Sequence, residues 1–305
     1  MRSGFVPIVG RPNVGKSTLT NALVGSKISI ISKRPQTTRN TIRGVVTGME
    51  EGVPAYQLVL VDTPGIHKPR TELGTRLNSL VYGTLAEADV VAFVIDATQP
   101  IGPGDRLIAE RLRQAKAETV VVVSKTDVAR KANVVEQLTE AAEWGFEAYV
   151  PVSALQGQNL EPLVAELVGR LPEGPLYFDP DTVSDQPDLD LAAELIREKF
   201  LDRLRDELPH SVVVVVDDMA ERDDELAVVA ARVIVERHSQ RGIVIGKGGE
   251  MLKTVGTEAR HELESLFGTR IHLDLRVVVE PDWQRRPQLL DRLGFGASGS
   301  RSNHP

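Results

Sequence analysis

A glycine-rich stretch near the start of the sequence has the residue types and spacing of a phosphate-binding loop. Gly10, Gly15, Lys16 and Ser17 match the pattern G-x-x-x-x-G-K-[ST], between an apolar run and a predicted helix. In this pattern glycines let backbone N–H groups turn onto phosphate, the lysine reaches the β- and γ-phosphates, and the serine ligates Mg²⁺. The start of the helix adds partial positive charge. The predicted nucleotide contacts are Gly10, Arg11, Pro12, Asn13, Val14, Gly15, Lys16, Ser17 and Thr18.

Three further motifs each follow a predicted strand. In DTPG at 62–65, the aspartate can hold Mg²⁺ through water and the glycine N–H can touch the γ-phosphate. In SKTD at 124–127, the aspartate can accept two hydrogen bonds from guanine, a pair that adenine does not offer, and SAL at 153–155 presents backbone to guanine O6. Ligands of open α/β sheets bind at the carboxyl ends of the strands, so the set predicts a guanine-nucleotide site. Its members are Asp62, Thr63, Pro64, Gly65, Ser124, Lys125, Thr126, Asp127, Ser153, Ala154 and Leu155.

Strand-like runs alternate with amphipathic stretches in the first part of the chain, and these elements must position the motifs. Such alternation is typical of a parallel sheet with helices on both faces, and continuous β-branched runs indicate strands that are covered on both sides. We therefore predict an α/β domain with a mostly parallel sheet over residues 1–171. Its strands are predicted at 6–9, 56–62, 90–96, 119–124 and 148–152, with a helix at 105–116.

The pattern changes at a proline-rich segment. Pro172, Pro175, Pro180 and Pro187 rule out a regular helix, so a linker is predicted at 172–188. The elements beyond it predict a small α+β domain at 189–280. Residues 281–305 then form a C-terminal extension whose small, polar tail is predicted to be disordered. The expected elements are a helix at 189–208, strands at 211–217 and 226–236, a short strand at 243–245, a helix at 250–267 and a strand at 271–279.

A second glycine loop, GKGG at 246–249, lies between the short predicted strand and a helix. G-x-x-G is the fingerprint of a KH domain, whose loop clamps the backbone of four nucleotides. Alone it also fits a strand-to-helix turn without a ligand. The order of elements favours a type II KH domain, and residues 231–276 carry a small excess of basic residues in a chain of net charge −7. We predict that RNA is bound by Ile243, Ile245, Gly246, Lys247, Gly248, Gly249 and Lys253.

Composition restricts the remaining possibilities. The 305 residues include no cysteine, and the six histidines lack ligand spacing, so disulfides and thiolate metal sites are ruled out and no zinc is predicted. No apolar run reaches about 18 residues, so no membrane span is expected, while peripheral membrane contact stays open. The net charge of −7 argues against indiscriminate nucleic-acid binding over the whole surface. These features suit a soluble protein of a reducing compartment.

The motifs together resemble the TRAFAC class of GTPases, and GRPNVGKS with DTPG resembles its Era-related branch. With a KH-like region behind them, nearly the whole chain is similar to the Era GTPase family. The resemblance implies a GTP hydrolase of small ribosomal subunit assembly that uses GTP or GDP and Mg²⁺. Its KH domain would bind single-stranded RNA near the three-prime end of small-subunit ribosomal RNA. The stretches that carry the likeness include QTTR, DTPGIH, AAELIREKF, ELP, VIGKGG, EAR and LGF.

The resemblance also implies a working cycle and a location. GTP would hold the arrangement of the domains that binds RNA, hydrolysis would release it, and the two states would differ across the 171–187 connector. QTTR at 36–39 resembles the first switch, in which Thr38, in preference to Thr37, would close on Mg²⁺ and the γ-phosphate. The metal ligands would then be Ser17, Thr38 and Asp62. Bacterial members are cytoplasmic, with some peripheral association at the inner face of the cell membrane.

Two residues depart from the family pattern. Ser124 stands where Asn is usual and is too short to bridge base and phosphate loop, so we predict weaker nucleotide holding with guanine selectivity kept by Asp127. Ile66 stands where many switches carry a water-orienting Gln, so slow hydrolysis is expected. The branch often pairs such an apolar residue with an asparagine as K⁺ ligand, here Asn13, which suggests K⁺-stimulated hydrolysis. The alternative is that Asn13 only stabilises the turn. The predicted catalytic residues are Lys16, Thr38, Asn13 and Gly65.

Two other functions stay in view. The first is a GTPase switch whose C-terminal domain binds protein or membrane, with GKGG as a mere turn. The second is a P-loop ATPase or small-molecule kinase, against which Asp127 and Thr38 argue. Asp127 alone would fit a helix N-cap. Because four motifs occur in register, the GTPase interpretation is preferred.

Overall fold

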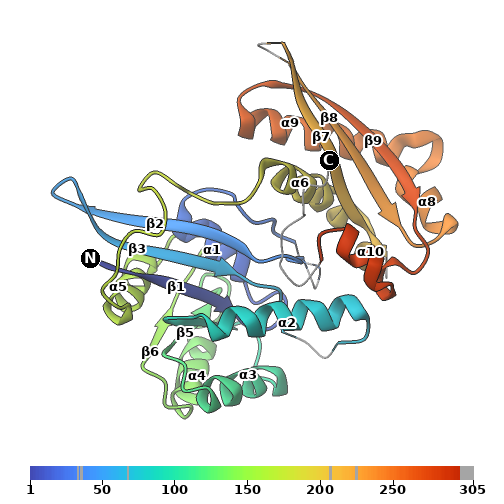
Figure 1. Cartoon of the computed structure of the whole chain (residues 1–305). Coiled ribbons are helices and arrows are strands. Elements are labelled where there is room, and N and C mark those ends of the chain that lie inside the picture. Colours follow the sequence, from blue (N-terminus) through green and yellow to red (C-terminus); the bar gives the residue numbers. More distant parts are fainter. Residues whose placement is uncertain (33, 35–36, 67–68, 206–207, 224–225, 296–305) are drawn as a thin grey trace. The chain divides into compact units, whose positions relative to one another are not determined.

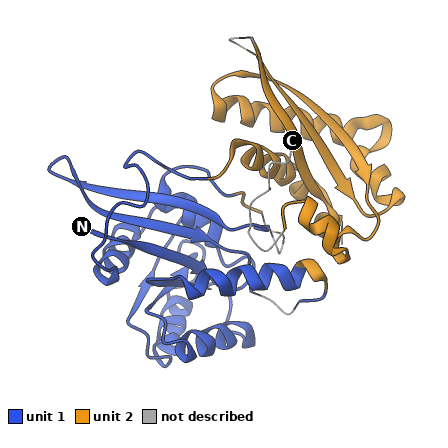
Figure 2. Ribbon diagram, viewed as in Figure 1, with its two compact units in different colours: residues 1–29, 35–70, 74–185 blue, residues 30–34, 71–73, 186–305 orange. Residues whose placement is uncertain are grey.

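The computed structural model describes residues 1–295, except 33, 35–36, 67–68, 206–207 and 224–225. The chain forms two compact units (Figure 2). The first unit comprises Met1–Ser29, Pro35–Arg70 and Gly74–Asp185. The second unit comprises Gln186–Pro305 together with two short segments from early in the sequence, Ile30–Arg34 and Thr71–Leu73.

The first unit is built on a six-stranded sheet with the order β2-β3-β1-β4-β5-β6 (Figure 1). Only β2 runs antiparallel to its neighbour, which confirms the predicted α/β class with a mostly parallel sheet. β2 is missing from the sequence prediction. It joins β3 through Glu51 and Gly52, whose positive φ angles of 50° and 81° suit a two-residue hairpin turn. The strands are β1 Arg2–Val9, β2 Ile42–Glu50, β3 Val53–Asp62, β4 Val91–Asp96, β5 Thr119–Ser124 and β6 Ala148–Pro151.

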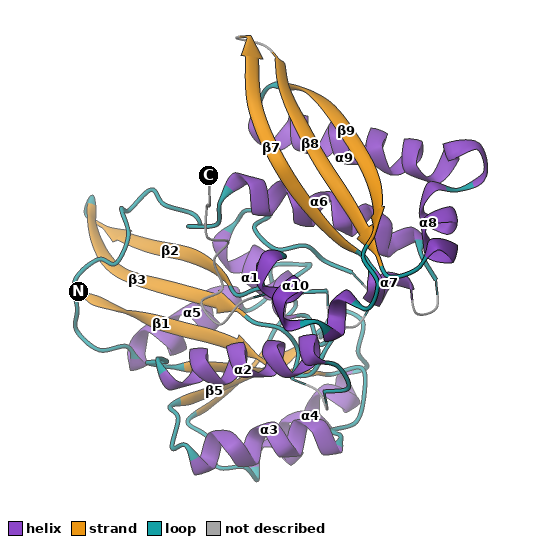
Figure 3. Ribbon diagram, turned by 45° about the vertical axis from the view of Figure 1, so that its right-hand side comes forward, coloured by secondary structure: helices purple, strands orange, loops and turns teal. Residues whose placement is uncertain are grey.

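Helices cover both faces of this sheet (Figures 1 and 3). On one face, Leu19 of α1 and Leu163 of α5 join a buried cluster with the strands. On the other face, Val81 of α2, Ile108 of α3 and Ala141 of α4 belong to a separate cluster. This coverage explains why β4 and β5 are apolar runs without alternation. The helices are α1 Lys16–Val24, α2 Glu72–Ala86, α3 Pro103–Gln114, α4 Lys131–Ala142 and α5 Leu160–Arg170.

The proline-rich segment belongs largely to the first unit, which corrects the predicted linker at 172–188. The buried Gln57 of β3 holds it: its Oε1 accepts the N–H groups of Tyr177 and Phe178 at 2.8 and 3.1 Å. Gln57 Nε2 donates to the Phe178 carbonyl at 2.9 Å, and Val45 N–H donates to the Val183 carbonyl at 2.8 Å. Proline excludes a helix here, yet an extended chain still pairs with strand edges, so the first unit extends to Asp185.

The second unit is an α+β fold around a three-stranded sheet, β7-β8-β9. β7 and β8 are antiparallel, and β8 and β9 are parallel. The predicted strand at 243–245 is wrong, because these residues end helix α8. Its start is capped by Gln240, whose side chain accepts the N–H groups of Glu236 and Arg237. Three apolar residues are too few to separate strand from helix. The elements are α6 Asp188–Arg203, α7 Leu208–Ser211, β7 Val213–Asp223, β8 Leu226–Val235, α8 His238–Ile245, α9 Glu250–Phe267, β9 Arg270–Val279 and α10 Pro287–Arg292.

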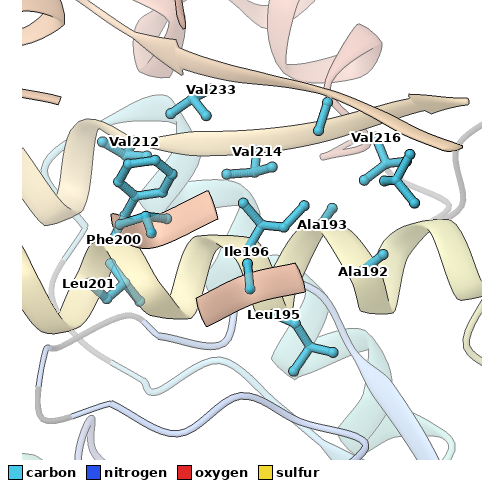
Figure 4. Packing of buried hydrophobic residues seen from close by; sticks show 14 of the residues in the cluster. Ala192, Ala193, Leu195, Ile196, Phe200, Leu201, Val212, Val214, Val216 and Val233 are labelled. Carbon is cyan, nitrogen blue, oxygen red and sulfur yellow. The ribbon is translucent and has the colours of Figure 1, made fainter. Parts of the chain in front are cut away.

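The core of the second unit lies between its sheet and helices α6 and α9. Figure 4 shows Ile196 and Phe200 of α6 facing Val214 of β7, while Leu195 points to the opposite side of the helix. The start of the C-terminal extension is packed too, since the buried Trp283 donates through Nε1 to the Ser211 carbonyl at 3.1 Å. The tail from 296 lies outside the described residues. No helix in the described part of the chain is both long enough and apolar enough to cross a membrane.

Candidate nucleotide site and RNA-binding loop

The phosphate loop lies between β1, which ends at Val9, and α1, which begins at Lys16. A Cβ at Gly10 would come within 2.4 Å of the Val94 carbonyl oxygen, and Gly15 has a left-handed φ of 103°. Both positions therefore require glycine. The loop thus brings backbone N–H groups and the start of a helix to the carboxyl edge of the sheet, which is the arrangement that binds phosphate.

Lys16 is buried inside this loop. Its Nζ donates to the carbonyl oxygens of Arg11 at 3.0 Å and Gly10 at 3.4 Å. Burial lowers the pKa of Lys16 to about 8, against the opposing attraction of the Asp62 carboxylate. The Lys16 ammonium therefore contacts uncharged carbonyl oxygens here, inside the loop where a phosphate would bind. A bound phosphate would stabilise the charged form of the lysine.

The three predicted metal ligands converge from separate elements. Ser17 Oγ of α1 lies 2.9 Å from Thr38 Oγ1, which lies 3.5 Å from Asp62 Oδ2 at the end of β3. Asp62 is fully buried, and its Oδ1 has no hydrogen-bond partner. Burial raises the pKa of Asp62, while the Ser17 hydroxyl and the Lys16 charge oppose this. One carboxylate and two hydroxyls fit Mg²⁺, which takes few protein ligands beside phosphate oxygens and water.

Among the described residues, no group of three or more histidine, aspartate or glutamate side chains is placed to hold a metal ion. The Asp62 Oδ1 atom, which has no hydrogen-bond partner in the described part of the chain, is the observation that best suits the predicted magnesium site. A buried oxygen without a partner is unfavourable, and a metal-bound water would satisfy it.

The predicted base-reading residues also come together. Ser153 Oγ donates to Asp127 Oδ1 at 2.8 Å and so orients the carboxylate. Lys125 Nζ donates to the Asn13 carbonyl and to Asp96 Oδ2, both at 2.6 Å, which ties this motif to the phosphate loop. Asp96 was missed by sequence reasoning, although it ends a predicted strand at the same edge of the sheet.

Ser124 does reach the phosphate loop. Its Oγ lies 2.5 Å from the Val14 carbonyl and 2.9 Å from the Ile95 carbonyl. A hydroxyl has one proton, so it donates to one of these carbonyls and has no second donor for a base. The serine therefore contacts the phosphate loop, as predicted for only one of the two roles of the usual asparagine, and the weaker nucleotide holding stays a prediction.

The remaining predicted contacts lie around the loop. Asn13 has a positive φ of 64°, a conformation that asparagine tolerates, which suits the turn-stabilising alternative. Arg11 Nε donates to Asp105 Oδ1 at 2.8 Å, so its guanidinium is held at the start of α3. A Cβ at Gly65 would meet Pro12 Cα at 2.7 Å, so only glycine lets the second switch approach the loop this closely.

Ile66 is a buried residue of the core cluster that packs beneath α3, and its N–H donates to the Gly10 carbonyl at 3.2 Å. Its side chain therefore has a packing role and cannot orient water. Gln36 of the predicted first switch lies outside the described residues.

The second glycine loop lies between α8 and the start of α9. A Cβ at Gly248 or Gly249 would meet nothing within 4 Å, so space is open above the loop, whereas one at Gly246 would come within 2.7 Å of Met251 Cβ. Lys247 is exposed beside it. Gly249 N–H donates to the Gly246 carbonyl at 3.1 Å, which closes the turn.

The apolar residues beside this loop have divided roles. Ile243 is 56% exposed and could contact a base, whereas the neighbouring Val244 is buried in the core. Ile245 is half-buried, and Lys253 is exposed one turn into α9. All the predicted RNA contacts therefore lie on one stretch of chain with accessible surface, and its helical geometry places Ile243 outward.

Comparison with known proteins bears on both units. The family described as 50S ribosome-binding GTPase matches residues 5–125, and the KH domain family matches residues 207–284. GTPase Era of Mycobacterium sp. (strain JLS) is 53% identical over 300 residues, which cover 96% of this chain and 99% of that protein. GTPase Era of Mycobacterium tuberculosis (strain ATCC 25177 / H37Ra) is 52% identical, with 96% and 98% covered.

Two solved structures are similar over almost the whole chain. A crystal structure of an Aquifex aeolicus Era variant bound to GDP.AlF4- has a TM-score of 0.92 and 38% identity, and it covers 97% of this chain and 100% of that one. A crystal structure of Era in complex with MgGDPNP and nucleotides 1506-1542 of 16S ribosomal RNA has a TM-score of 0.91 and 38% identity, with 97% and 99% covered.

Proposed function

This chain belongs to the Era family of GTPases, and on that premise we propose that its second unit binds the three-prime segment of small-subunit ribosomal RNA. We propose further that this binding depends on the nucleotide state of the first unit and serves assembly of the small ribosomal subunit. The observation that supports RNA binding most strongly is the accessible Gly246–Gly249 turn at the start of α9, within a KH fold.

The physical case rests on what this turn offers to a nucleic-acid backbone. Open space above Gly248 and Gly249 lets phosphates approach the main chain closely. The exposed Lys247 adds charge, and the start of the 18-residue helix α9 adds partial positive charge. The exposed Ile243 side chain beside the turn gives a base an apolar contact. These features fit single-stranded RNA better than a bilayer, which would need a broader apolar face.

The small subunit is the preferred target because of which parts of this chain the similar proteins match. The family whose description names the 50S subunit matches only residues 5–125, so that description says nothing of the second unit. The relative crystallised with a 16S ribosomal RNA segment matches this chain over 97% of its length, including the KH fold. With such a target, we propose a cytoplasmic location. Peripheral contact with the inner membrane face is an additional hypothesis that the family resemblance alone suggests.

In the first unit, we propose that named residues bind the nucleotide and stabilise the negative charge that develops on its phosphates during hydrolysis. Lys16 would contact the β- and γ-phosphates, Gly65 N–H the γ-phosphate, and Asp127 the guanine edge. Ser17, Thr38 and Asp62 would hold Mg²⁺, which supplies neutralisation of phosphate charge when bound. We also propose that K⁺ binds beside Asn13. The buried, apolar Ile66 cannot orient the attacking water, so another group must lower the barrier, and a cation would do so by stabilising the charge that develops in the transition state.

The RNA-binding proposal is tested by Gly248→Asp. Binding of a labelled RNA oligomer that copies the three-prime end of small-subunit ribosomal RNA should weaken by about ten-fold or more, because an acid would face phosphate. GTP hydrolysis should stay within about two-fold of wild type, since the turn lies outside the nucleotide site.

Gly268→Asp is the matched control. Gly268 has a similar left-handed φ of 69°, open space around it, and a position at the other end of α9. It should leave RNA affinity unchanged. Equal RNA affinity in both variants and wild type would reject RNA binding at this turn and favour a protein or membrane partner.

A further inference from the structure

The chain that leads into the first switch, QTTR at 36–39, crosses between the two units. Residues up to Ser29 belong to the first unit, whereas Ile30–Arg34 belong to the second (Figure 2). The chain then returns to the first unit, where Thr38 lies beside Ser17 in the nucleotide site. The segment directly ahead of the first switch is therefore also a structural part of the proposed RNA-binding unit.

The peptide before this segment is fixed to the first unit. Asn21 of α1 donates through Nδ2 to the Ser29 carbonyl at 2.7 Å. Its Oδ1 accepts the N–H groups of Ser29 at 2.9 Å and Ile28 at 3.0 Å. Three hydrogen bonds to one side chain leave this part of the backbone little freedom, so Ser29 is a fixed point directly ahead of Ile30.

The segment itself is anchored in the second unit at three points. Ile30 is 1% exposed and lies in the same buried cluster as Leu195 and Phe200 of α6. Ile31 N–H donates to Glu198 Oε1 of α6 at 2.8 Å. Arg34 donates to the Leu204 carbonyl, at the C-cap of α6, at 2.7 Å. A cation at a helix C-terminus is also favoured by the helix dipole.

The chain makes a similar crossing near the second switch. Thr71–Leu73, a few residues behind the DTPG motif, belongs to the second unit and includes the start of α2. Thus the chain enters the second unit shortly before the first switch and again shortly after DTPG, the two elements that read the γ-phosphate in GTPases. Because consecutive Cα atoms stay about 3.8 Å apart, a short connection limits how far its two ends can move apart.

We propose that Ile30–Arg34 is the element through which the RNA-binding unit senses the nucleotide, with Ile30 and Arg34 as its anchors on α6. Only three residues of sequence separate Thr38 from Arg34, so closure of Thr38 on a bound metal and γ-phosphate would act on Arg34 at the end of α6. By thermodynamic reciprocity, RNA bound to the second unit must bias the same switch and change nucleotide affinity by the same factor. This inference rests on the proposed function.

The test is the coupling factor, defined as the RNA dissociation constant with GDP and Mg²⁺ divided by that with a non-hydrolysable GTP analogue and Mg²⁺. It is measured on the full chain with the labelled RNA oligomer. For wild type we expect a factor in the common range of about 5 to 150. Ile30→Ala and Arg34→Met should each bring it to within about two-fold of one, because each removes an anchor.

Ile31→Ala is the matched control, since Ile31 is the adjacent isoleucine, is 42% exposed, and contributes only its N–H to the anchorage. It should keep the wild-type factor. If Ile30→Ala unfolds the second unit, RNA binding is lost with both nucleotides, and Arg34→Met alone decides.

The outcomes separate this inference from the proposed function. A wild-type factor above five that is retained in Arg34→Met and in a folded Ile30→Ala variant would overturn the inference and leave the proposed function standing. RNA binding that is absent, or equal in both nucleotide states, in wild type would overturn the proposed function and the inference together.

Discussion

At the scale of single residues, the buried Lys16 links nucleotide binding to pH. Its pKa of about 8 means that a large part of the free protein has a neutral lysine at pH 8.5. Bound phosphate stabilises the ammonium, so binding should take up a large part of one proton at that pH. Affinity should accordingly weaken as the pH rises through 8.

Calorimetry of GDP binding in two buffers with different protonation heats measures this uptake. The heats should differ between buffers at pH 8.5, where the GDP phosphates are fully ionised and the lysine is the group that takes up the proton. Lys16→Met should abolish the buffer dependence while binding more weakly. Buffer-independent heats for wild type at pH 8.5 would show that the lysine is already fully charged in the free protein.

Ser124 is the second residue whose chemistry can be measured. The hydroxyl contacts the Val14 carbonyl but has no further donor for the base. Ser124→Asn should therefore tighten GDP binding by about five-fold, the equivalent of about 1 kcal/mol for one neutral hydrogen bond. Ser124→Ala should weaken it by a similar factor, because the loop contact is lost.

Fluorescent GDP titration gives both dissociation constants. Guanine preference over adenine should persist in both variants, since base reading is proposed for Asp127, which neither variant changes. If Ser124→Asn binds GDP no better than wild type, an asparagine adds no hydrogen bond to the base, and the prediction is wrong.

At the scale of elements, sequence patterns predict buried strands better than edges. The apolar runs of β4 and β5 are recognised because both their faces are covered. β2 is not, because this edge strand carries glycine and polar residues and depends on β3 for its register. The run 243–245 was predicted as a strand but ends a helix, because three apolar residues are too few to show a helical or strand period.

The candidate site shows the same limit. Residues inside motifs, such as Asp62 and Asp127, can be found from spacing. Asp105 cannot, because its contact with Arg11 joins positions 94 residues apart. The anchoring of Ile30 in the second unit is likewise invisible in sequence, where the segment 30–34 only precedes the QTTR motif. Long-range pairing is the information that local patterns lack.

The proposal that the phosphate loop binds K⁺ through Asn13 can be tested by comparing salts. If K⁺ beside Asn13 stabilises charge in the transition state, GTP turnover should be faster in KCl than in NaCl at equal ionic strength. Asn13→Ala should remove the difference and leave GDP affinity largely intact. Equal wild-type rates in the two salts would leave Asn13 with only the turn-stabilising role that its positive φ suits.

At the scale of the whole molecule, two compact units share one chain that crosses between them more than once. The proline-rich segment, once paired with β2 and β3, no longer provides a long free connection. On the inference proposed above, the two short segments beside the switches, Ile30–Arg34 and Thr71–Leu73, would offer a shorter route from nucleotide to RNA. Communication would then depend on short anchored peptides near the γ-phosphate rather than on the connector.

The central claim, that the second unit holds small-subunit ribosomal RNA by its glycine turn, is tested most directly by crosslinking in living cells followed by sequencing of the bound RNA. Wild type and Gly268→Asp should give reads concentrated at the three-prime end of small-subunit ribosomal RNA, and Gly248→Asp should lose that peak. Reads spread evenly over unrelated RNAs, or a peak that survives Gly248→Asp, would contradict the account.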